Sequence, residues 1–139
     1  MAYTDEQLQR IYDRTSGYCH ICHKKLSFVN YAQYGARSAW EVDHSKAKAR
    51  GGTNHGNNLY PACISCNRSK RAGSSRAART RNGQCRAPYS RAKVRAKRND
   101  NQLGGVITGG IIGSRFGPGG AVVGALLGAW FGDKNTPKK

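Results

Sequence analysis

Two cysteine pairs are the clearest candidates for chemistry in this 139-residue chain. Each pair has the spacing C-x-x-C, as Cys19/Cys22 and Cys63/Cys66, and residues 23–62 separate the pairs. Four thiolates arranged in this way match the tetrahedral ligand set of a structural zinc ion. The sequence therefore predicts a closed zinc site that stabilises the fold and takes no part in a reaction. A redox pair and free core thiols are the alternatives.

The remaining thiol and three of the histidines are weaker candidates. His20 and His23 lie beside the first cysteine pair, and either could replace a cysteine as a ligand, although surface histidines are the favoured interpretation. His55 lies in a glycine-containing loop and could contact phosphate, but a loop histidine without a role is favoured. Cys85 has no partner at C-x-x-C spacing and is expected to be a spare thiol.

An Asp-His dipeptide, Asp43-His44, lies between the cysteine pairs, and Asn67 directly follows the last of the four cysteines. Hydrolysis of a phosphodiester needs a base for the attacking water and positive charge on the phosphate. The imidazole of His44 suits the base, because the ordinary pKa of histidine lies near neutral pH. The oxygens of Asp43 and Asn67 suit a hard divalent cation such as Mg²⁺. Each residue alone could be a surface side chain or a helix cap, but together they favour a hydrolytic site.

The chain is strongly basic, with a formal net charge of +17 from 24 Lys and Arg against 7 Asp and Glu. No acidic residue occurs between His44 and Asn99. This charge predicts a polyanionic partner, most simply DNA, with RNA less expected and an anionic membrane surface as the alternative. Phosphate contacts read no bases, so we expect low sequence specificity and steep salt dependence. The candidate nucleic-acid-binding residues nearest the predicted site are Arg50, Arg68, Lys70 and Arg71.

The elements that must position these residues can be predicted from local patterns. Residues 4–14 have a capping-box pattern and an apolar face, which indicates a helix. Residues 40–44 alternate apolar and polar side chains and predict a strand that ends at the histidine. Glycine-rich residues 45–57 predict a loop, residues 58–63 the return strand of a hairpin, and residues 64–72 a helix.

Residues 19–70 resemble the HNH endonuclease family, in its four-cysteine zinc subgroup. The motifs that carry the resemblance are Cys19/Cys22, Asp43-His44, Asn58-Leu59, Cys63/Cys66, Asn67 and Lys70. The resemblance implies an α+β fold of the ββα-metal type, a treble-clef-like hairpin and helix stabilised by zinc.

The resemblance also implies roles for individual residues. His44 would be the general base, and Asp43 and Asn67 would bind a catalytic Mg²⁺ or Mn²⁺ ion. Asn58 would form hydrogen bonds across the hairpin loop and orient His44. Many members of the family have histidine where this chain has Asn67, and a phage resolvase that cuts branched DNA has asparagine there.

Composition divides the chain into three parts: a nuclease domain at 1–72, a basic flexible arm at 73–102 and a glycine-rich tail at 103–139. Apolar residues are too sparse in the arm to fold it alone, which indicates a disordered or partly helical segment. In the tail, glycine recurs at every fourth residue on both sides of a Pro-Gly turn, which is typical of closely packed helices. We expect a glycine-zipper helical hairpin, and self-association or membrane contact through residues 103–132; disorder is the remaining alternative.

The first 14 residues lack the apolar stretch of a secretory signal, which indicates a cytoplasmic protein, encoded by a bacterium or phage. Membrane association through the tail is the alternative location. The predicted function is a divalent-metal-dependent DNA endonuclease that needs no small-molecule cofactor. The rival prediction is a non-catalytic zinc module that binds nucleic acid and tethers it to a membrane or an assembly.

Overall fold

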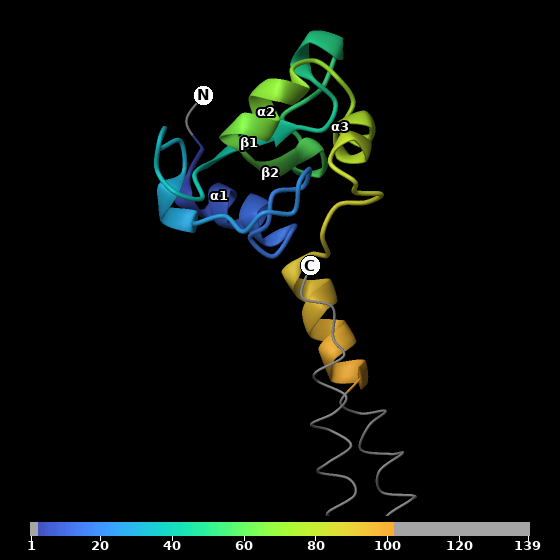
Figure 1. The fold of residues 1–139 in the computed structure, drawn as a ribbon. Coiled ribbons are helices and arrows are strands. Elements are labelled where there is room, and N and C mark those ends of the chain that lie inside the picture. Colours follow the sequence, from blue (N-terminus) through green and yellow to red (C-terminus); the bar gives the residue numbers. More distant parts are fainter. Residues whose placement is uncertain (1–2, 102–139) are drawn as a thin grey trace, which may run out of the picture. The chain divides into compact units, whose positions relative to one another are not determined.

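The computed structural model describes residues 3–101 (Figure 1). These residues fall into two compact units that divide after Arg91. The described part of the second unit is residues 92–101, which are helical. The predicted glycine-zipper hairpin at 103–139 lies outside the described residues.

Helix α1, Asp5–Asp13, confirms the first predicted helix. Its capping box is formed, because the Gln7 backbone N–H donates to Thr4 Oγ1 (3.3 Å) and the Thr4 backbone N–H donates to Gln7 Oε1 (3.0 Å). These two bonds satisfy backbone donors that the first turn of a helix leaves unpaired. One face of the helix is buried, through Leu8, Ile11 and Tyr12.

Strands β1, Trp40–His44, and β2, Leu59–Cys63, pair antiparallel, as the sequence predicted. Their register places Trp40 opposite Cys63 and His44 opposite Leu59. Side chains alternate across a strand, so Trp40 and Asp43 point to opposite faces of the sheet. Trp40 is completely buried against Tyr12 of α1, with ring centroids 5.5 Å apart.

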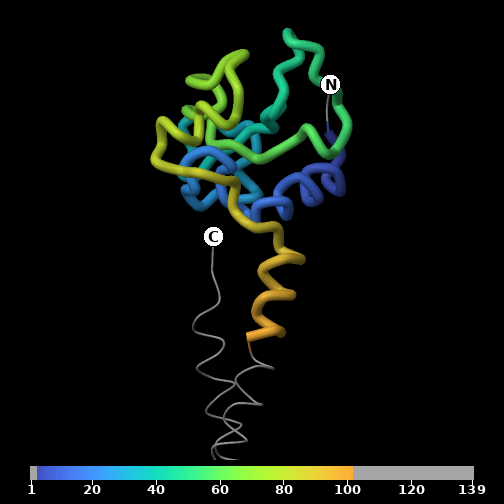
Figure 2. The backbone as a smooth tube through the Cα atoms, turned by 90° about the vertical axis from the view of Figure 1, so that its right-hand side faces the viewer, coloured from blue at the N-terminus to red at the C-terminus, as the bar shows by residue number. Residues whose placement is uncertain are grey.

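Helix α2, Ile64–Lys70, follows β2 without a loop and crosses the other face of the hairpin, which confirms the α+β class. It ends where Arg71 takes a positive φ of 50°. Short 3₁₀ turns, η1 at Phe28–Asn30, η2 at Lys48–Arg50 and η3 at Gly56–Asn58, lie in the loops. Figure 2 shows the hairpin loop as the teal-to-green part of the tube that leads away from β1 and returns to β2.

The hairpin loop requires glycine at one close approach. A Cβ atom on Gly52 would lie 1.8 Å from the Lys46 carbonyl oxygen, a backbone atom that cannot move aside. The close approach of residues 46 and 52 within the loop therefore requires glycine at position 52.

Helix α3, Ser75–Arg81, lies in the segment whose composition indicated a flexible arm. Its first turn is capped by Ser74, whose hydroxyl accepts from the Ala77 backbone N–H (3.1 Å). Ser75 and Ala78 are buried, with 4% and 2% of their surface exposed. The segment packs because small residues fit against the existing core, so few apolar side chains are needed.

Residues 82–91 lead from α3 back to α1. The Ser16 hydroxyl donates to the Tyr89 carbonyl (2.9 Å), and Arg91 forms an exposed ion pair with Asp13 (3.3 Å). The first compact unit therefore extends to Arg91. No helix within residues 3–101 has the length and hydropathy needed to cross a membrane.

Candidate functional site

The sulfur atoms of Cys19, Cys22, Cys63 and Cys66 lie within 4.8 Å of one another. Cys22 Sγ and Cys63 Sγ are 3.7 Å apart, close to the edge of about 3.8 Å that a tetrahedron with Zn–S bonds of about 2.3 Å requires. The first pair lies in the turn after α1, and the second joins the end of β2 to the first turn of α2. The donor set and its spacing therefore fit one zinc ion.

The four thiols are linked to one another by hydrogen bonds. The hydrogen bond from Cys19 lowers the pKa of the Cys22 thiol to about 6, and hydrogen bonds within the cluster raise the pKa of the Cys19 and Cys66 thiols. Cys85 is exposed and lies outside the cluster. His23 also lies outside it, because its Nε2 pairs with the Arg86 carbonyl at 2.9 Å.

Asp43 is buried, and both of its carboxylate oxygens have partners. Oδ2 lies 2.7 Å from His20 Nε2, and Oδ1 accepts from the Lys70 ammonium at 2.9 Å. Lys70 also donates to the His44 carbonyl (2.8 Å) and is only 3% exposed. Lys70 was predicted to contact phosphate, but in this structure its ammonium is buried and paired, so that contact stays a prediction.

His20 links this ion pair to a second cation. Its Nδ1 lies 3.5 Å from Arg79 Nη1, and its ring stacks on Tyr60 with centroids 5.1 Å apart. Burial lowers the pKa of His20 although its hydrogen bond to Asp43 opposes the shift, so the imidazole is neutral at pH 7. The result is a connected series of side chains from Lys70 through Asp43 and His20 to Arg79. Sequence reasoning missed His20 and Arg79 here, because no local pattern joins them to Asp43.

Asn67, which was predicted to bind a divalent cation, pairs with Glu41 in this structure. Its side-chain nitrogen donates to Glu41 Oε2 (2.8 Å), and Glu41 Oε1 accepts from the Tyr34 hydroxyl (2.7 Å). The oxygens of Asp43 are meanwhile buried and occupied. In this arrangement both oxygens of Asp43 are paired, whereas the Asn67 contact uses its amide nitrogen, so a cation shared by these two residues stays a prediction.

His44 lies at the end of β1, is partly exposed, and has its Nε2 2.9 Å from Asn54 Oδ1 in the hairpin loop. Asn58 clamps the same loop: its Oδ1 accepts from the Lys46 backbone N–H (2.7 Å), and its Nδ2 donates to the carbonyls of Lys46 (3.0 Å) and Thr53 (2.9 Å). Asn58 therefore sets the loop path that carries Asn54 to His44.

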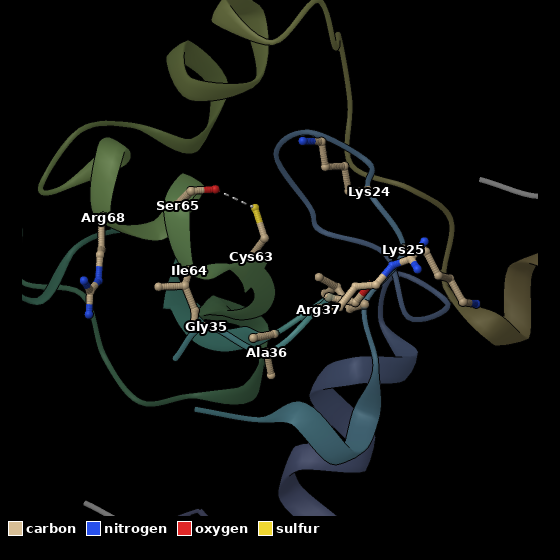
Figure 3. A pocket seen from close by; sticks show the side chains of 12 residues that line it. Lys24, Lys25, Gly35, Ala36, Arg37, Cys63, Ile64, Ser65 and Arg68 are labelled. Atoms are coloured by element: carbon tan, nitrogen blue, oxygen red, sulfur yellow. Dashed lines mark hydrogen bonds between the residues drawn. The ribbon is translucent and has the colours of Figure 1, made fainter. Parts of the chain in front are cut away.

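Three of the predicted nucleic-acid-binding residues, Arg50, Arg68 and Arg71, are exposed. The Arg68 guanidinium lies 4.6 Å from the centre of the Tyr34 ring. Arg68 also lines a pocket of about 610 Å³ opposite a group of further cations (Figure 3). That group is Lys24, Lys25 and Arg37, none of which the sequence singled out.

The ion pair predicts a large cost for removing Asp43. Asp43→Ala would leave the buried Lys70 ammonium without an anion, so we expect a loss of about 3–5 kcal/mol in unfolding free energy. Urea unfolding of the zinc-loaded chain measures it. Glu41→Ala is the matched control, two residues earlier on the same strand face, and should cost about 1 kcal/mol. Equal costs for the two variants would contradict the assigned role of Asp43.

Residues 19–73 match the family model described as HNH endonuclease. The matched segment runs from the first cysteine ligand past α2, and it includes the hairpin with His44 and Asn58. A search of the curated proteins and a search of the solved structures each found no match. The match supports nuclease activity in general.

Proposed function

We propose, from the premise that residues 19–73 belong to the HNH endonuclease family, that the chain hydrolyses phosphodiester bonds of DNA. The observation that carries the proposal is the placement of His44 within that matched segment. Its imidazole is partly exposed at the end of β1 and is oriented by Asn54. A neutral imidazole in this position can take the proton of a water molecule that attacks a phosphate.

The four cysteines would hold a structural zinc ion, which would tie the turn after α1 to the junction of β2 and α2. This junction is the base of the hairpin that carries His44. The hydrogen bonds of Asn58 then fix the loop end of the hairpin, so His44 is held in place from both ends of the hairpin.

The proposal includes a requirement for Mg²⁺ or Mn²⁺, which the family resemblance implies. Asp43 can offer an oxygen to such an ion only if its bond to His20 or to Lys70 is given up. The requirement for the ion is tested by comparing plasmid cutting with and without added Mg²⁺ or Mn²⁺.

The substrate class follows from charge. Arg50, Arg68 and Arg71 are exposed around the hairpin and α2, and the chain as a whole carries a net charge of +17. Such a surface binds the backbone of DNA through phosphates rather than bases. We propose cleavage of low sequence specificity for this reason.

A second candidate function is binding of nucleic acid without hydrolysis. The specific observation in its favour is that both carboxylate oxygens of Asp43 are already paired within the protein. A domain of this kind would keep the zinc-stabilised fold and the basic surface, and would retard DNA in a gel without cutting it.

Incubation with supercoiled plasmid separates the two functions. The zinc-loaded chain is assayed with added Mg²⁺, with added Mn²⁺, and in resin-treated buffer that contains neither; EDTA is avoided because it would also remove zinc. We expect nicked or linear plasmid with at least one added ion and intact plasmid without it. Cutting in the resin-treated buffer would contradict the metal requirement, and retardation without cutting in every buffer would support the binding module.

A further inference from the structure

A polar pocket of about 560 Å³ lies between the hairpin loop and α3. Two separate parts of the chain form it: the loop, from Ser45 to Asn58, and the start of α3, from Ser74 to Arg79. We propose that this pocket binds one backbone phosphate of a nucleic acid, with Lys46, Arg76 and Arg79 as its cations. The inference takes only the substrate class from the proposed function.

The lining of the pocket suits an anion with several acceptor oxygens. Every residue that lines it is polar or charged, and none is acidic. Its three cations come from both walls, Lys46 from the loop, and Arg76 and Arg79 from α3. The hydroxyl of Thr53 on the loop side can supply a further donor. Charge-assisted hydrogen bonds of this kind are the strongest that a phosphate can accept.

Arg79 supplies an independent observation. Its Nε is buried and has no hydrogen-bond partner among the described residues. Arg79 also lines the pocket, which has no acidic residue in its lining, so an anion bound there would compensate the charge of this guanidinium. Its Nη1 lies 3.5 Å from the buried His20, which is held in turn by Asp43, so the guanidinium is ordered before any ligand arrives.

The position of the pocket connects it to the proposed reaction. Ser45 and Lys46 line it and directly follow His44, and Asn58 lines it while clamping the loop. The residues from α3 lie beyond the family match, which ends at residue 73. The α3 wall of the pocket therefore lies outside the family match, and a phosphate bound there would place a neighbouring part of the backbone near His44.

The test uses the full-length, zinc-loaded chain with ¹⁵N-labelled arginine. Three probes are titrated separately: the dinucleotide d(TpT), its uncharged methylphosphonate analogue and inorganic phosphate. We expect the Nε–Hε resonance of Arg79 to shift and saturate with d(TpT) and to stay in place with the methylphosphonate. A response to the methylphosphonate, or no response to d(TpT), would overturn the proposal. Saturation by inorganic phosphate at equal concentration would overturn the assignment to a nucleic-acid backbone.

Two variants make the test specific to the pocket. Arg76→Ala removes an exposed arginine that lines it, and we expect about tenfold weaker binding of d(TpT), the loss typical of one charge-assisted hydrogen bond. Arg81→Ala removes an exposed arginine from the same helix that does not line this pocket, and should leave the affinity unchanged. Equal losses would show nonspecific charge binding and would overturn the proposal. No readout depends on cutting, so the inference and the proposed function can fail separately.

Discussion

Removing zinc is expected to unfold the first compact unit of the chain. Its core is small, and a core of this size rarely stabilises a domain alone; the large buried side chains are those of Leu8, Ile11, Tyr12, Ile21, Leu26, Trp40 and Leu59. Structural zinc in small domains contributes about 10–16 kcal/mol of apparent binding free energy, which equals or exceeds the usual stability of a domain. Loss of the ion should therefore abolish the folded state at room temperature.

The measurement combines metal analysis with spectroscopy. Zinc content of one ion per chain is expected, and a zinc chelator should shift the tryptophan emission to the red because Trp40 is fully buried when the chain is folded. Cys22→Ser should resemble the chelated wild type. Cys85→Ser, which alters an exposed thiol outside the cluster, is the matched control and should unfold as wild type does. A chelated chain with an unchanged urea midpoint would show that the cysteines do not stabilise the fold through a metal.

His44→Ala is expected to slow plasmid cutting by about 10²–10⁴-fold, the usual contribution of a general base. The side chain is partly exposed at a strand end, so its removal should leave the unfolding free energy within about 0.5 kcal/mol of wild type. His44→Gln should be equally slow, because an amide can pair with Asn54 but cannot accept a proton from water. Single-turnover nicking rates give the effect, and fluorescence anisotropy with a DNA duplex should show unchanged binding.

A second histidine tests whether the loss is specific. His23→Ala removes an imidazole that contacts the Arg86 carbonyl, away from the hairpin loop, and should cut plasmid at the wild-type rate when zinc is saturating. A cutting rate for His44→Ala within about threefold of wild type would remove His44 from the reaction, because a general base contributes far more than that.

Local features of the sequence predicted much of the fold. The capping box at Thr4 and Gln7 fixed the start of α1, and the alternation in residues 40–44 gave β1 its bounds. The zinc cluster was predictable because each C-x-x-C pair is a local pattern. The fold only has to bring the two pairs together. These predictions depend on neighbours in sequence, and tertiary contacts did not override them.

The partners of Asp43 could not be predicted in the same way. Asp43 is separated from His20 and Lys70 by long stretches of chain, and their contacts depend on how α2 and the cysteine turn pack on one sheet face. Spacing alone suggested an open metal ligand, whereas burial made the carboxylate the anion of an internal ion pair. The packing of helix α3 could not be predicted for a related reason: an alanine such as Ala78 carries little hydrophobic signal, yet it is buried in the core.

The return of residues 82–91 to α1 has a practical consequence for anyone shortening this protein. The recognisable domain stops at residue 73, but Tyr89 and Arg91 are held by side chains that precede the first cysteine. A version truncated at the end of the family match would expose the surface that Ala78 covers. It would also lose the Ser16–Tyr89 hydrogen bond and the Asp13–Arg91 ion pair. The smallest piece that can be expected to fold independently is longer than the piece that sequence comparison detects.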